Sequence, residues 1–135
     1  MATGKKYYFD TAIFIYALEN GREDARELIT QALQEGTVGT SVVTIMEYCT
    51  GCYKHERRDI AERFRSFLSK YAFEIQQVDE SVALEAAEIR ASFPAFRQMD
   101  ALQIASAKIA GADVFYTNDK QLLKFRDDGI QIVSM

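Results

Sequence analysis

Four acidic side chains have the types and positions that suit the binding of a divalent metal ion: Asp10, Glu47, Asp100 and Asp119. Asp10 and Asp119 follow short runs rich in aromatic residues, which are typical of buried strands. Glu47 and Asp100 lie at or near the starts of segments with helical periodicity. Carboxylate ligands without imidazole or thiolate favour Mg²⁺ or Mn²⁺ over zinc. Such an ion can activate water for phosphodiester hydrolysis, so this pattern predicts nuclease chemistry.

The four acids are expected to meet at one edge of a sheet. Parallel strands joined by right-handed crossovers present their carboxyl ends at the same edge, where ligands bind. Two carboxylates about 4 Å apart repel by roughly 4 kcal/mol at an effective dielectric constant of about 20. Lys120 is the only basic residue in the short motifs that carry the acids. We therefore expect a divalent cation to supply the counter-charge.

Each acid also has a simpler structural interpretation. Asp10 stands between a strand and an apolar helical run, where it could cap the helix by accepting backbone N–H hydrogen bonds. Asp100 lies in the first turn of its helix, where a negative charge is stabilised by about 0.3–1 kcal/mol. For either residue alone, both interpretations stay open. The four acids taken together favour ion binding.

The elements that must position these acids alternate between strand and helix along the chain. Hydrophobic periodicity and turn residues predict strands at residues 6–9, 37–41, 73–76, 114–116 and 129–133. They predict helices at residues 12–18, 22–35, 42–53, 54–70, 79–93, 98–110 and 120–125. This alternation predicts a single α/β domain over residues 1–135.

Glu47 is expected at the edge of the buried face of its helix. The predicted apolar stripe of that helix consists of Val42, Ile45, Met46, Cys49 and Tyr53. A rotation of about 100° per residue places Glu47 at the border of this stripe. A carboxylate in that position can reach a crevice.

The composition is that of an ordinary globular protein. The chain has 135 residues, one proline and a net charge of −4. This charge argues against binding to nucleic acid through bulk positive charge, although it leaves room for a local basic patch. No segment approaches the length of a membrane span, so we expect a cytoplasmic protein without membrane contact.

Cys49 and Cys52 have the spacing of a redox site or half of a metal site. They lie inside a helical pattern, whereas a thioredoxin-like pair begins a helix. Zinc needs four ligands, and His55 is the only other soft ligand nearby. We therefore expect ordinary, partly buried thiols. His55 also lies apart from the acidic motifs, which argues against a histidine-based nuclease.

Four short motifs surround the acids and run along nearly the whole chain. They are Phe9-Asp10-Thr11 before an apolar helix, Thr40-Ser41-Val42-Val43-Thr44 leading to Glu47, Met99-Asp100-Ala101-Leu102-Gln103-Ile104-Ala105-Ser106-Ala107, and Tyr116-Thr117-Asn118-Asp119. In this order and spacing, the chain resembles the PIN domain family, and within it the VapC-type toxin ribonucleases.

The resemblance implies a Rossmann-like sheet of about five parallel strands in the order 3-2-1-4-5, with helices on both faces. It also implies a metal-dependent endoribonuclease with one or two Mg²⁺ or Mn²⁺ ions. The implied site residues are the catalytic metal ligands Asp10, Glu47, Asp100 and Asp119 and the supporting residues Thr11, Thr117 and Asn118. The implied partners are an RNA substrate, a small antitoxin whose tail enters the acidic groove, and a second copy in a homodimer.

The chain departs from the family pattern at two positions. Ala12 stands where a polar residue is common, which removes a hydroxyl from that side of the site. Asn118 stands where relatives often carry a basic residue, which makes a phosphate contact there less favourable. Arg97, three residues before Asp100, is the substitute for such a contact with RNA, together with Lys120.

Two other protein classes compete with this hypothesis. One is a non-catalytic binding module that uses the acidic pocket as a docking surface. The other is a receiver-like phosphoacceptor domain, which also has aspartates at strand ends. That class needs adjacent acids after the first strand and a lysine at the end of a late strand, and this sequence fits both requirements poorly.

Overall fold

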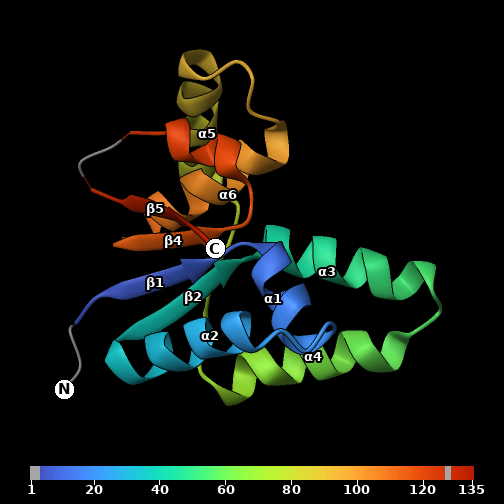
Figure 1. The fold of residues 1–135 in the computed structure, drawn as a ribbon. Coiled ribbons are helices and arrows are strands. Elements are labelled where there is room, and N and C mark those ends of the chain that lie inside the picture. The colour runs from blue at the N-terminus through green and yellow to red at the C-terminus, as the bar shows by residue number, and fades with distance from the viewer. Residues whose placement is uncertain (1–3, 127–128) are drawn as a thin grey trace.

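The computed structural model describes residues 4–126 and 129–135, which form one α/β domain around a five-stranded sheet (Figure 1). The strands are β1 (Lys6–Phe9), β2 (Thr37–Ser41), β3 (Glu74–Gln76), β4 (Val114–Thr117) and β5 (Gln131–Ser134). All neighbouring strands are parallel, in the order β3-β2-β1-β4-β5. The predicted fold class and strand order are therefore confirmed.

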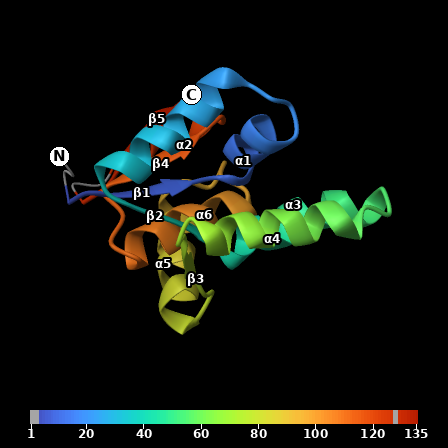
Figure 2. The same cartoon turned by 90° about the horizontal axis from the view of Figure 1, so that it is seen from below.

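Helices cover both faces of the sheet. They are α1 (Thr11–Leu18), α2 (Glu23–Glu35), α3 (Val42–Lys54), α4 (Arg58–Lys70), α5 (Glu80–Ser92), α6 (Gln98–Ile109) and a 3₁₀ helix, η1 (Lys120–Lys124). Helices α3 and α4 lie side by side and extend away from the sheet (Figures 1 and 2). Among the described residues, none of the helices combines the length and hydropathy needed to cross a bilayer.

The central strand β1 is buried on both faces, as its three aromatic residues predict. Tyr7 and Phe9 belong to the core beneath α1 to α4, whereas Tyr8 belongs to the core beneath α5 and α6. Gly39 pairs with Tyr8 in the sheet, and a Cβ at position 39 would lie 2.2 Å from Cε1 of the Tyr8 ring. Only glycine leaves room for the Tyr8 ring to lie over this position of β2.

The predicted buried face of α3 is wrong in part. Met46 and Tyr53 are 50% and 46% exposed, whereas Thr44 and Tyr48 are buried. Tyr48 stacks on Phe64 of α4 with a centroid distance of 3.9 Å. Packing between α3 and α4 therefore sets the rotation of α3, and the buried Thr44 is tolerated because its hydroxyl is hydrogen-bonded.

The end of the chain also differs from the prediction. The predicted α-helix at residues 120–125 is the short η1 helix, and the predicted strand at 129–133 is Gln131–Ser134. Leu122 and Phe125 are three residues apart, and both are buried. Leu122 lies within η1 and Phe125 directly follows it, so this short segment buries both side chains.

Candidate functional site

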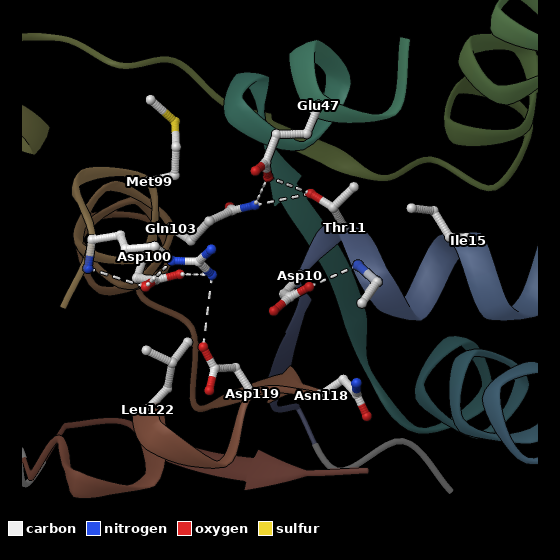
Figure 3. A pocket seen from close by; sticks show the side chains of 12 residues that line it. Asp10, Thr11, Ile15, Glu47, Met99, Asp100, Gln103, Asn118, Asp119 and Leu122 are labelled. Carbon is white, nitrogen blue, oxygen red and sulfur yellow. Dashed lines mark hydrogen bonds and ion pairs between the residues drawn. The ribbon is translucent and has the colours of Figure 1, made fainter. Parts of the chain in front are cut away.

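The four predicted acids line one cavity of about 530 Å³ (Figure 3). Asp10 and Asp119 follow the carboxyl ends of β1 and β4, while Glu47 projects from α3 and Asp100 from α6. Parallel strand order brings these segments together although they are far apart in the sequence. The acids therefore share one groove, as the sequence predicts, and their role as metal ligands stays a prediction.

Asp10 is held by two different hydrogen bonds. Its Oδ1 accepts from the backbone N–H of Ala12 at 2.8 Å and caps α1, while its Oδ2 accepts from Thr117 Oγ1 at 2.6 Å. Burial raises the pKa of Asp10, and the charges of Glu47 and Asp100 add to this effect, whereas the two hydrogen bonds oppose it. The capping role and the position in the cavity are thus compatible.

Glu47 is held by neutral donors at the base of the cavity. Thr11 Oγ1 donates to Glu47 Oε1 at 2.7 Å, and Gln103 Nε2 lies 3.4 Å from the same oxygen. Thr11 and Gln103 are only 8% and 6% exposed. Sequence reasoning missed Gln103 as a site residue. The available signal was a long polar side chain three residues after Asp100, in a helix of otherwise mostly small and apolar residues.

Asp100 and Asp119 are paired with Arg97. The guanidinium Nε lies 3.1 Å from Asp100 Oδ2, and Nη2 lies 3.8 Å from Asp119 Oδ2. The hydrogen bond to Asp100 raises the pKa of Arg97. Arg97, which lies outside the short motifs that carry the acids, therefore brings a positive charge to two of them. Arg97 enters the cavity from the turn before α6, whereas Lys120 is exposed and is not one of the described residues that line it.

Thr117 and Asn118 contribute in different ways. Thr117 is fully buried, and its hydroxyl accepts the backbone N–H of Asp119 at 3.0 Å while it donates to Asp10. It thereby connects two of the four acids. Asn118 lines the cavity and donates from Nδ2 to the hydroxyl of Tyr16 at 2.7 Å.

The donor chemistry of the cavity fits a hard divalent ion. Its candidate ligands are carboxylates, and no histidine or cysteine lines it in the described part of the chain. Within residues 4–126 and 129–135, no three acidic, histidine or cysteine side chains are already grouped closely enough to hold an ion. Arg97 is ion-paired with two of the four carboxylates. Ion binding therefore requires a local rearrangement of side chains.

The two cysteines and the histidine of the chain lie outside this cavity. Cys49 and Cys52 are free and buried within α3, and burial raises the pKa of both thiols. This environment is opposite to that of a reactive thiolate. His55 is the C-cap residue of α3, and it is not among the described residues that line the cavity.

Comparisons with known proteins agree with the architecture. A family model described as the PIN domain matches residues 7–127. A search of curated proteins found no significant match. Similar solved structures include VapBC2 of Rickettsia felis bound to a promoter DNA fragment, with 18% identity, TM-score 0.80 and coverage of 96% of this chain and 98% of that one.

Two further structures show the same fold. DNA-bound VapBC of Salmonella typhimurium has 22% identity and TM-score 0.75, with coverage of 96% of this chain and 98% of that one. A toxin-antitoxin complex from Klebsiella pneumoniae has 23% identity and TM-score 0.75, with coverage of 94% and 95%. Nearly the whole chain therefore shares its fold with these proteins.

Proposed function

Because the chain belongs to the PIN domain family, we propose that it is a metal-dependent endoribonuclease that acts as the toxin of a type II toxin-antitoxin pair. The observation that carries this proposal is the gathering of four carboxylates, from four separate segments, in one cavity. The similar VapBC and toxin-antitoxin structures support the toxin role. Their names also support a small antitoxin as the partner.

Asp10, Glu47, Asp100 and Asp119 would hold Mg²⁺ or Mn²⁺ through their carboxylate oxygens. When bound, the ion supplies the Lewis acid that polarises the phosphodiester and lowers the pKa of the attacking water. The chain provides orientation. Thr117 directs Asp10, and the donors around Glu47 direct that carboxylate.

Hydrolysis in this site would attack phosphorus with water and leave a 5′-phosphate and a 3′-hydroxyl. The chain needs no side-chain nucleophile for this reaction. Arg97 is 79% exposed at the mouth of the cavity, and its guanidinium suits contact with a substrate phosphate once it leaves the carboxylates. A homodimer and a cytoplasmic location remain part of the proposal.

Cleavage of a fluorescently labelled RNA in the presence of Mn²⁺ tests the reaction. Asp100→Asn should abolish cleavage, because it removes a negatively charged ligand while keeping the size of the side chain. Asp79→Asn is the matched control, since Asp79 caps α5 through Val82 N–H at 3.0 Å but lies outside the cavity. Equal activity of the two variants would contradict the proposal.

The ion pairs of Arg97 favour one alternative, a non-catalytic module whose acidic pocket binds a basic group of a partner. In that case the pocket prefers a guanidinium or ammonium group to a divalent ion. Thermal unfolding with and without Mn²⁺ separates the two functions. The nuclease requires a rise in Tm that Glu47→Ala reduces, whereas the binding module predicts no rise with either chain.

A further inference from the structure

A buried amide connects the helix of Asp100 to the helix of Glu47. Gln103 lies three residues after Asp100 in α6, so the two side chains project from neighbouring positions on one face. Both side chains line the cavity, but Gln103 is only 6% exposed and points toward Thr11 of α1 and Glu47 of α3 (Figure 3). A primary amide in this environment needs hydrogen-bonding partners for both its oxygen and its nitrogen.

The partners of Gln103 determine the orientation of its amide. Oε1 accepts from Ser41 Oγ at 2.8 Å, and Nε2 donates to Thr44 Oγ1 at 2.8 Å. Nε2 also lies 3.3 Å from Thr11 Oγ1 and 3.4 Å from Glu47 Oε1. The reversed amide would place its oxygen against the Glu47 carboxylate, which is repulsive. The network therefore allows one arrangement.

This arrangement acts on Glu47 in two ways. Thr11 donates its hydroxyl hydrogen to Glu47 Oε1 at 2.7 Å, and the Gln103 amide supplies a donor to the Thr11 oxygen. Ser41, which donates to Gln103, is also the N-cap of α3 and accepts from Val43 N–H at 3.2 Å. Gln103 thus contacts both the start of α3 and the carboxylate that α3 carries.

We propose that Gln103 is a positioning residue that holds Glu47 for ion binding, an inference that rests on the proposed function. All described hydrogen bonds to the Glu47 carboxylate go to Oε1. The amide is suited to this task because it donates without adding charge. A glutamate at position 103 would repel Glu47, and an apolar residue would remove one hydrogen-bond partner from each of three buried hydroxyls.

The test compares Gln103→Met with Ser106→Ala in the full chain. Methionine keeps the length of the side chain but removes both polar atoms. Ser106 is the matched control, because it is buried on the same helix and its hydroxyl has no hydrogen-bond partner among the described residues. Two quantities are measured: the Mn²⁺ concentration at half of the maximal rise in Tm, and kcat and KM for RNA cleavage.

Gln103→Met should raise the Mn²⁺ midpoint about tenfold and lower kcat by a similar factor, because loss of a residue that orients a metal ligand costs about 10–100-fold. The KM for RNA should stay within about twofold of the native value. Ser106→Ala should change neither the midpoint nor kcat. A native midpoint and native kcat in Gln103→Met would overturn the positioning role.

A double-mutant cycle distinguishes positioning from a general effect on folding. In a Glu47→Ala background, Gln103→Met should shift the Mn²⁺ midpoint less than about twofold, because its target is gone. A tenfold shift in both backgrounds contradicts action through Glu47. If Gln103→Met does not fold, Thr11→Val removes only the hydroxyl next to Glu47, and an unchanged midpoint in that variant also overturns the proposal.

The failure of this proposal can be separated from failure of the proposed function. A native protein that neither responds to Mn²⁺ nor cleaves RNA contradicts the function, and the positioning role falls with it. A native protein that does both, paired with a Gln103→Met variant that is unchanged, contradicts only the positioning role.

Discussion

The two sides of the acidic cavity are held by different chemistry. On one side, Asp10 and Glu47 accept hydrogen bonds from neutral groups, chiefly the buried hydroxyls of Thr117 and Thr11. On the other side, Asp100 and Asp119 are paired with the guanidinium of Arg97, which is 79% exposed. We call these the hydroxyl-bound side and the arginine-bound side.

The comparison shows that the hydroxyl groups orient their carboxylates, whereas the guanidinium neutralises the charge of its carboxylates. A hydroxyl donor directs a carboxylate while its negative charge remains available to a cation. A guanidinium neutralises the carboxylates that it contacts, but Arg97 itself is open to solvent, and an ion pair with a solvated partner is weak and easily exchanged. The hydroxyl-bound side is therefore preorganised, and the arginine-bound side is adaptable. Variants on the two sides should behave differently.

The largest effect is expected from Asp10→Asn, on the hydroxyl-bound side. RNA cleavage should fall at least about 100-fold, because a ligand matters at least as much as the residues that orient it. Tm without metal should be unchanged or higher, because the variant removes a buried charge that faces Glu47 and Asp100. Cleavage assays and thermal unfolding measure both. A strongly destabilised but active variant would show that Asp10 is structural.

Thr117→Val should have the next largest effect. It removes the 2.6 Å hydrogen bond to Asp10 and leaves the backbone N–H of Asp119 without its acceptor. The free energy of unfolding should fall by about 2 kcal/mol, as measured by urea denaturation. Cleavage should fall about tenfold. A loss of stability below about 0.5 kcal/mol would show that this side is not preorganised by Thr117.

Arg97→Ala should have a smaller effect of the opposite sign on ion binding. The free energy of unfolding should change by less than about 1 kcal/mol. The Mn²⁺ midpoint should fall by up to roughly fivefold, because the competing cation is removed from Asp100 and Asp119. The KM for RNA should rise if Arg97 also contacts phosphate. A higher Mn²⁺ midpoint in Arg97→Ala would contradict the distinction between the two sides.

The smallest effect is expected at the thiols, which lie outside both sides. Cys49→Ser and Cys52→Ser should leave the kcat for RNA cleavage within about twofold of native. Because burial raises the pKa of both thiols, their reaction with a chromogenic disulfide should be slower at pH 8 than that of a free cysteine, and should increase at higher pH. Rapid reaction of either thiol at neutral pH would instead support a redox role for Cys49 and Cys52.

The order of strands and helices could be predicted because it depends on local signals. The aromatic run Tyr7–Phe9 predicts a strand buried on both faces, and this strand is central in the sheet. The strand order itself came from the family resemblance. The prediction was wrong where local signals were weak, as at residues 120–125, where the chain forms only a short 3₁₀ helix over Lys120–Lys124.

The sequence by itself determined which acids are present and that each stands at the end of a strand or near the start of a helix. It did not determine what holds them. The positions of Gln103 and Arg97 depend on the rotation of α3 and α6 about their axes and on the approach of distant segments. The packing of side chains, such as Tyr48 against Phe64, decides how the helices are rotated and how close the distant segments come. Hydrogen bonds form only where this packing brings a donor and an acceptor together.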